Sequence, residues 1–184
     1  MARIGSFIAL RSGKRWHHFD PLPCDVDIED IAHSLAMQCR WTGHTSRPYS
    51  IASHSLHVCD LVANHLGAPE HALSALLHDA AEAYYGDVAT PLKRMLPEYK
   101  TALALGEDIV AEALGIPSEM PAIVRVADMM ALGDEARDLI GPVPEWVPPK
   151  ASGLPCVDET WREARDRFLE RHHALKSAAE RKAG

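Results

Sequence analysis

The sequence lacks a long apolar run, since no stretch of about 18 consecutive apolar residues occurs in it. A membrane-spanning helix is therefore not expected. The segment from Met1 to Phe7 is too short and too polar to be read as a secretory signal. Cysteines are also scarce, four in all and without a CxxC pair. Few, unpaired cysteines predict reduced thiols in a cytoplasmic protein rather than a disulfide framework.

Positive charge is in short supply as well. The chain carries 19 Lys and Arg against 26 Asp and Glu, for a formal net charge of −7. This balance argues against binding of long nucleic acid. It leaves room for a single small nucleotide, because a local metal ion and a few cations decide such binding. At 184 residues and 47% hydrophobic residues, the chain fits one domain, 1–184, with a sizeable core.

Helical patterns fill most of this length, so the predicted fold class is all-α. A short N-terminal β-hairpin is expected within 6–20, around a Gly-containing turn. The core spans 27–140, a Pro- and Gly-rich loop covers 141–156, and a C-terminal helix covers 157–180. The helices expected in the core run from Asp27 to about Cys39, and over 51–66, 98–114 and 118–139.

The most informative stretch is the alanine-rich segment at 73–93. No Gly or Pro interrupts it before Gly86, so it predicts one helix from Pro69 to a stop at Gly86. His78, Asp79 and Glu82 lie in its middle among apolar residues. A lone His-Asp pair is most often an ordinary surface pair. Charged groups enclosed by apolar neighbours must be paired or metal-bound, because leaving them desolvated and alone is costly.

Two further residues suggest a metal site. His54 lies on an earlier predicted helix, and Asp128 lies inside the very apolar run at 123–132. Two imidazoles and two carboxylates, from His54, His78, Asp79 and Asp128, form a mixed nitrogen and oxygen ligand set. That set suits one divalent transition metal such as Co, Mn, Zn, Fe or Ni, and leaves open further ions with the substrate.

At these residues the sequence resembles the HD-domain metal-dependent phosphohydrolases, whose pattern is a His, then a His-Asp pair, then a distant Asp. The string from His78 to Lys93 resembles HD-domain 5'-deoxynucleotidases. The strings Cys39–His44 and Tyr49–Ser55 resemble a phage branch that includes dATP triphosphohydrolases. The resemblance covers roughly 27–140 and implies a helical bundle around a central metal. One departure is Ser53, where the nucleotidases usually carry Glu.

The resemblance also implies roles for other residues. Glu82 would hold or deprotonate the attacking water, with Asp87 sharing that work or binding a further ion. Arg40 would contact the substrate phosphate, and Lys93, which follows Thr90-Pro91, would offset its charge. Trp41 and Trp16 are the candidate contacts to the base. The residues themselves suggest that Trp16 covers the mouth of a pocket if the hairpin is ordered; the alternative is a loose N-terminal arm. Without the resemblance, Arg40 is only a partner of a helix dipole, and the segment from Asp87 to Lys93 an ordinary loop.

Three functions stay open at this point. The first is a phosphohydrolase of deoxyribonucleotides, either a 5'-deoxynucleotidase or a dNTP triphosphohydrolase. The second is an HD hydrolase of another nucleotide phosphoester, and the third is a non-catalytic, metal-stabilised binding module. Related enzymes form dimers or rings, so the resemblance implies a homo-oligomer. Two details complete the prediction: His57 as a buried polar residue, and a solvated face formed by Asp134, Glu135, Arg137 and Asp138.

Overall fold

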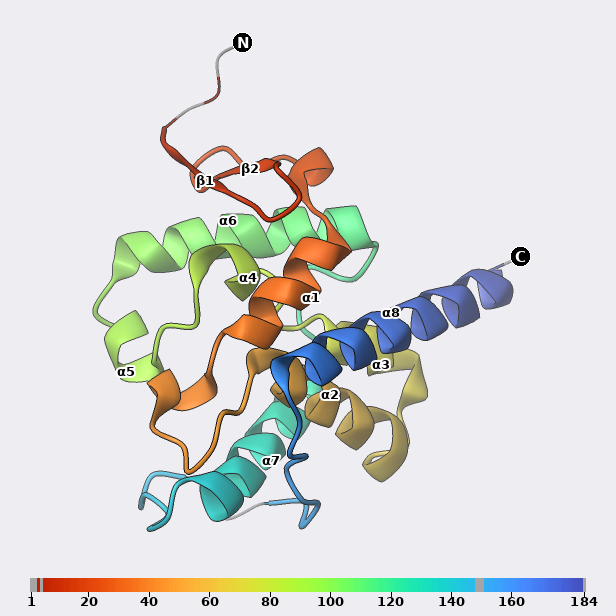
Figure 1. Ribbon diagram of the computed structural model, residues 1–184. Coiled ribbons are helices and arrows are strands. Elements are labelled where there is room, and N and C mark those ends of the chain that lie inside the picture. The colour runs from red at the N-terminus through yellow and green to blue at the C-terminus, as the bar shows by residue number, and fades with distance from the viewer. Residues whose placement is uncertain (1–2, 4, 148–150, 184) are drawn as a thin grey trace.

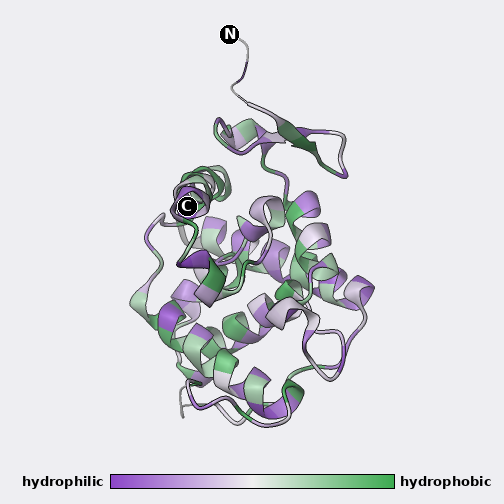
Figure 2. Ribbon diagram, turned by 90° about the vertical axis from the view of Figure 1, so that its left-hand side faces the viewer, coloured by the Kyte–Doolittle hydropathy of each residue, from purple (hydrophilic) through white to green (hydrophobic). Residues whose placement is uncertain are grey.

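The computed structural model describes residues 3, 5–147 and 151–183, and in them the predicted fold class is confirmed. Eight α-helices form the body and a two-stranded antiparallel hairpin stands at one end (Figure 1). Green and purple alternate along the helices in Figure 2, as expected for helices that bury one face. No helix in the described residues is long and apolar enough to cross a membrane.

The hairpin pairs β1 (Phe7–Ala9) with β2 (Arg15–His17), with Ile8 opposite Trp16. Gly13 adopts φ 87° in the connecting turn, a conformation that costs glycine little. Trp16 is completely buried and stacks on Tyr84, with ring centroids 3.9 Å apart. The prediction that Trp16 covers a pocket and contacts substrate is therefore wrong, because its indole is part of the core and has no exposed surface.

Helix α2 (Ile51–Asp60) lies at the centre of the body, where all but its last residue are buried. It begins at Ser50, whose side chain accepts a hydrogen bond from the Ser53 amide, and it continues as a π-helical turn, Leu61–His65. Helices α1 (Ile28–Met37), α3 (Ala72–Leu76), α7 (Ala122–Leu139) and α8 (Trp161–Ala183) all pack against it. Of the four predicted metal ligands, His54 lies on α2 and Asp128 on α7, while His78 and Asp79 follow α3 directly.

The predicted continuous helix from Pro69 to Gly86 is wrong in its middle. Helix α3 ends at Leu76 and α4 spans only Glu82–Tyr85, with turns between them. The Ala75 carbonyl, which an α-helix would use for the Asp79 amide, instead accepts from the His78 ring at 2.8 Å. The following amides bond three residues back, as in Ala80 to Leu77 and Glu82 to Asp79. His78 and Asp79 therefore lie on a tight turn.

The remaining helices cover this centre. The short α5 (Thr90–Lys93) follows α4, and α6 (Pro97–Leu114) ends at the left-handed Gly115. Gly106 on α6 lies where a β-carbon would come 2.3 Å from the Tyr85 ring, so a larger residue there would have to displace that ring. The predicted C-terminal helix, 157–180, is shifted along the chain and is observed as α8, Trp161–Ala183. Three-residue turns at Pro23–Asp25 and Pro69–His71 and the turn Arg40–Gly43 complete the elements.

Candidate metal centre

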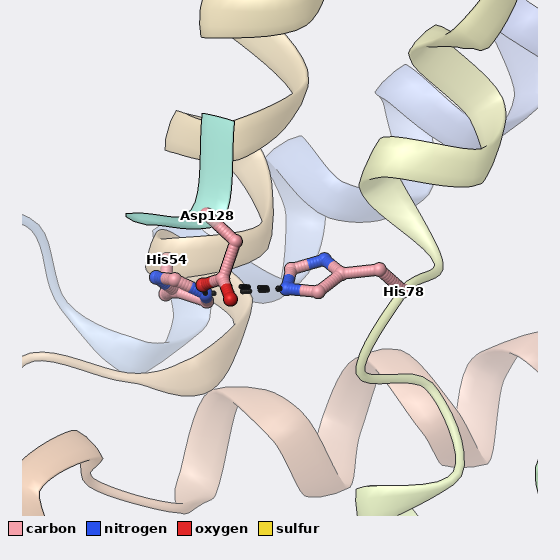
Figure 3. A group of neighbouring side chains, drawn as sticks. All are labelled: His54, His78 and Asp128. Carbon is pink, nitrogen blue, oxygen red and sulfur yellow. Dashed lines mark hydrogen bonds and ion pairs between the residues drawn. The ribbon is translucent and has the colours of Figure 1, made fainter. Parts of the chain in front are cut away.

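His54, His78 and Asp128 converge from α2, the turn after α3, and α7 (Figure 3). One donor atom from each of the three lies within 4.8 Å of the others. The two imidazole Nε2 atoms are 3.3 Å apart. Asp128 Oδ1 lies 3.2 Å from Nε2 of His54 and 4.0 Å from Nε2 of His78. Ligands bonded at about 2.1 Å around one octahedral ion sit roughly 3 to 4 Å apart, so these spacings fit a single ion.

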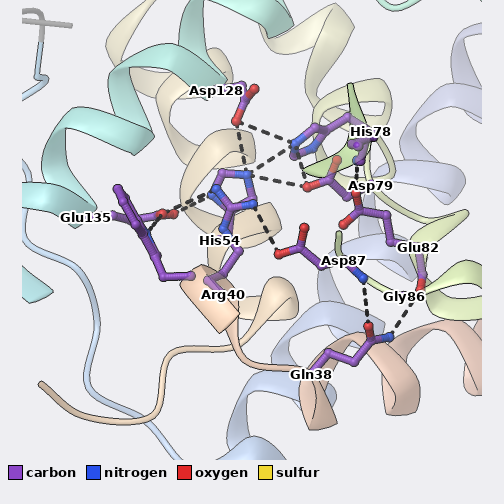
Figure 4. Close-up of polar contacts among 12 residues, drawn as sticks. Gln38, Arg40, His54, His78, Asp79, Glu82, Gly86, Asp87, Asp128 and Glu135 are labelled. Carbon is purple, nitrogen blue, oxygen red and sulfur yellow. Dashed lines mark hydrogen bonds and ion pairs between the residues drawn. The ribbon is translucent and has the colours of Figure 1, made fainter. Parts of the chain in front are cut away.

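Asp79 supplies the fourth predicted ligand from the same turn as His78. Its Oδ2 lies 3.2 Å from His78 Nε2 and 3.6 Å from His54 Nε2 (Figure 4). The break in the helix makes this possible, since neighbouring side chains on a regular helix point about 100° apart. Asp79 thus lies beside both imidazoles, next to the group formed by His54, His78 and Asp128.

The outward-facing ring nitrogens define the tautomer of each histidine. His54 Nδ1 lies 2.5 Å from Glu135 Oε1, and His78 Nδ1 lies 2.8 Å from the Ala75 carbonyl. Both partners accept hydrogen bonds, so each Nδ1 carries a proton, and a ring that is neutral presents the lone pair of its Nε2 to the site. Two such lone pairs 3.3 Å apart, beside two carboxylates, repel one another unless a proton or a metal cation lies between them. The donor set therefore fits a divalent metal.

The charges around the site also favour a bound cation. Burial and the charge of Arg40 lower the pKa of His54, but Glu135 and Asp128 outweigh them and raise it to about 10. Burial opposes ionisation of Asp79, yet the neighbouring His78 holds the pKa of that carboxyl well below its usual range. A field that stabilises positive charge this strongly also favours a metal cation.

Glu82 approaches from α4 with one carboxylate oxygen engaged and the other free. Its Oε1 accepts from Lys93 Nζ at 3.0 Å, whereas its Oε2 is buried without a hydrogen-bond partner. Burial, followed by the charges of Asp79 and Asp87, raises the pKa of Glu82 to about 8, although Lys93 opposes the shift. A free, buried carboxylate oxygen is suited to hold a water molecule.

Arg40 connects the two sides of the site. Its Nη2 lies 3.3 Å from Glu135 Oε2, and its Nη1 lies 3.9 Å from Asp87 Oδ2. The side chain of Gln38 bonds both the Glu82 carbonyl, at 3.1 Å, and the Asp87 amide, at 3.2 Å. Gln38, which follows the last residue of α1, was not among the predicted site residues. Its two bonds hold the loop that contains Asp87 against the end of α1.

Comparisons with known proteins identify the family of this chain. No family model matches the chain. The uncharacterized protein YfdR of Escherichia coli (strain K12) is 41% identical over 134 residues, which cover 73% of this chain and 72% of YfdR. The chain belongs to the YfdR family. Another member, the uncharacterized protein RCAP_rcc00048 of Rhodobacter capsulatus, is 36% identical over 189 residues, covering 90% of this chain and 93% of that protein.

In this YfdR-family protein the prediction from the sequence is wrong for two acidic residues of α7. Asp134 and Glu135 were predicted on a solvated face, yet both are completely buried. Glu135 contacts His54, and Asp134 Oδ2 lies 3.1 Å from Nε2 of His57, one helical turn further along α2. His57 is buried, as predicted. Position 135 lies two helical turns after Asp128 and so on the same face of α7, and this spacing could have identified Glu135.

Trp41 reaches the same carboxylate from the turn after α1. Its Nε1 donates to Glu135 Oε2 at 2.8 Å. The backbones of Trp41 and Thr42 are left-handed, at φ 57° and φ 53°, which is rare for residues other than glycine and costs about 1 kcal/mol or more at each. The backbone is thus strained at the turn from which Arg40 and Trp41, two predicted substrate contacts, reach Glu135.

Proposed function

We propose that this protein is a divalent-metal-dependent phosphohydrolase that acts on deoxyribonucleotides. The observation that carries the proposal is the convergence of His54, His78, Asp79 and Asp128 with both imidazole Nε2 atoms turned inward. The resemblance of the same residues to HD-domain phosphohydrolases supplies the reaction class. Glu82, Lys93 and Arg40 around the ligands supply the remaining groups that hydrolysis of a phosphoester needs.

A divalent ion held by the four ligands would act as a Lewis acid on the phosphoryl group and acidify nearby water. Arg40 would bind the phosphate through its planar guanidinium, which matches phosphate oxygens in pairs. Its partners Glu135 and Asp87 hold it from two sides, so it approaches the phosphate with little conformational freedom to lose.

The Glu82 carboxylate would orient the attacking water through its free Oε2 and accept the proton that the water loses. Lys93 bonds the other oxygen of Glu82, at 3.0 Å, and its positive charge would offset charge that develops on the phosphate. The water oxygen then forms the new bond to phosphorus as the bond to the leaving oxygen breaks. Asp87 would share the handling of the water, or bind a further ion with the substrate.

A product assay tests this proposal. The purified protein is incubated with Co²⁺, Mn²⁺ or Mg²⁺ and each deoxynucleoside mono- and triphosphate, and the released inorganic species is identified. Phosphate from monophosphates makes the protein a 5'-deoxynucleotidase, and triphosphate from a dNTP makes it a triphosphohydrolase. Turnover of another phosphoester alone would overturn the substrate class. No turnover with any metal would overturn the enzyme and favour a metal-stabilised binding module.

A pair of variants tests the roles within the site. Glu82→Gln should keep the metal and lose at least a hundredfold in kcat, because the proton acceptor is gone. Glu98→Gln, on the exposed first turn of α6, is the matched control and should turn over normally. Native turnover by Glu82→Gln would show that the base is elsewhere. The proposal also includes a cytoplasmic homo-oligomer, which light scattering of the purified protein measures.

A further inference from the structure

Two tryptophans meet beside the metal centre. The rings of Trp41 and Trp146 lie 5.8 Å apart at an interplanar angle of 32°. Trp146 is 65% exposed, which is unusual for so large an aromatic side chain. In Figure 1 the segment that follows α7 lies beside the orange loop that leads from the turn after α1 to α2, and the Ser46 amide of that loop bonds the Leu139 carbonyl at 2.8 Å. Trp146 therefore presents an open aromatic surface on one side while its neighbour Trp41 leads inward.

The backbone holds Trp146 outward. The Val147 amide bonds the Pro144 carbonyl at 3.0 Å, which closes a turn with Trp146 inside it. Val147 is buried at the end of this turn, and Pro144 restricts the backbone at its start. A turn anchored by the next residue keeps the indole at the surface, although burying that ring would be favourable by roughly 2 kcal/mol. The exposed ring thus lies in a hydrogen-bonded turn with a buried neighbour.

Trp41 links this ring to the ligands. Its indole Nε1 donates to Glu135 Oε2 at 2.8 Å, and the other oxygen of Glu135 contacts His54. Arg40, the preceding residue, bonds the same Glu135 oxygen at 3.3 Å. Adjacent residues of one turn therefore offer a guanidinium and an aromatic ring. A nucleotide carries the matching groups, a phosphate and a planar base, at its two ends.

We propose that Trp146 forms a stacking platform for the base of the substrate, with Trp41 as its support. The inference rests on the proposed function and adds the part of the site that recognises the base. Stacking on an indole requires only a flat aromatic ring, so it tolerates different bases and favours the larger purines over pyrimidines. The platform would raise affinity for nucleotides over sugar phosphates that lack a base.

Trp146→Ala and Trp146→Phe are compared with the native protein on a purine deoxynucleotide, a pyrimidine deoxynucleotide and 2-deoxyribose 5-phosphate. We expect Trp146→Ala to raise KM for the purine nucleotide about tenfold, since one base–aromatic stack is worth about that much in affinity. The pyrimidine should lose less, and Trp146→Phe should lie between Ala and native. Turnover of the baseless sugar phosphate should not change, and it shows on the same sample that the variant is folded.

The control is Phe19→Ala, which removes a similarly exposed aromatic residue, 66% exposed, from beside the hairpin. It should leave every KM unchanged. Equal KM values for Trp146→Ala and the native protein on the purine nucleotide would overturn the platform while leaving the proposed function intact. If the protein hydrolyses nothing, the quenching of tryptophan fluorescence is used to measure the binding of deoxynucleosides. Loss of that quenching in Trp146→Ala supports the platform without the enzyme, and unchanged quenching overturns it.

Discussion

Glu135 Oε1 lies 2.5 Å from His54 Nδ1, and both side chains are completely buried. Arg40 and Trp41 bind the other oxygen of Glu135, so the carboxylate is satisfied on both sides. Although burial opposes ionisation, Arg40 and His54 lower the pKa of Glu135 to about 2. Glu135 is therefore ionised at neutral pH and holds the His54 ring with Nε2 facing the other ligands.

Glu135→Gln should weaken metal binding by about 10- to 100-fold, because loss of the partner of a ligating histidine typically has that effect. The amide keeps the shape of the side chain but loses the charge that orients His54. Isothermal titration with Mn²⁺ or Co²⁺ measures the change. Glu112→Gln, an exposed residue of α6, is the control and should bind metal as the native protein does. Native affinity in Glu135→Gln would show that His54 is oriented without Glu135.

The sequence predicted the four ligands because each lies in apolar surroundings or in a recognisable string. It did not predict Glu135, whose partner His54 is 81 residues away and which lies in a charged stretch with Asp134, Arg137 and Asp138. It also predicted a continuous helix through His78, because local propensity there is uniformly helical. The break depends on the bond from the His78 ring to the Ala75 carbonyl, a tertiary choice that local propensity does not encode.

A second histidine–carboxylate pair lies beside the first, between His57 and Asp134. Asp134 is completely buried and accepts from His57, the Gly153 amide at 3.0 Å, Arg137 at 2.8 Å, and the Ser152 hydroxyl. We expect Asp134→Ala to lower the free energy of unfolding by about 3 kcal/mol or more, because several buried donors lose their acceptor. Asp134 thus fastens the 151–156 segment to α7 and α2.

Urea unfolding measures the effect of Asp134→Ala. The control is Asp166→Ala, since Asp166 is 56% exposed and pairs only with the neighbouring Arg165 among the described contacts. Its change should stay within about 0.5 kcal/mol. A loss of the same small size in Asp134→Ala would mean that water or other groups replace the acceptor at little cost.

Removal of the metal should leave the protein folded but less stable. The apolar core, with Leu35, Ile51 and Leu76 fully buried, does not depend on the ligands. At a free metal concentration about a hundred times the Kd, the ion should add about 2.7 kcal/mol to the free energy of unfolding. Thermal melts with Mn²⁺, and after chelation, measure the shift, while circular dichroism reports the helices.

Asp128→Asn provides the matched test of that shift, because the Asp128 side chain is 37% exposed and its loss should leave the fold intact. The metal-induced rise in Tm should shrink strongly in Asp128→Asn. It should persist in Asp108→Asn, an exposed change on α6. Complete loss of helical signal on chelation would instead assign the metal a structural role, and no shift in any protein would exclude metal binding at this centre.

His172 on α8 should make the fold sensitive to acid. It is 3% exposed and neither ring nitrogen has a hydrogen-bond partner. Burial, with the positive charges of His173 and Lys176, lowers the pKa of His172 to about 4, below the roughly 6.5 of an unfolded histidine. The folded state therefore keeps His172 neutral. Its contribution to stability is complete above about pH 6.5 and is lost as the pH falls towards 4.

The loss reaches about 3 kcal/mol at pH 4, from the difference between the two pKa values. His172→Leu and His172→Gln cannot take up this proton, so both variants should gain stability relative to the native protein as the pH falls. Urea unfolding of the three proteins between pH 7.5 and pH 4 measures the relative change. If both variants gain the same stability relative to the native protein, the gain comes from the missing proton and not from the polarity of the side chain. If the native protein and both variants lose stability in parallel, another group is responsible for the acid sensitivity.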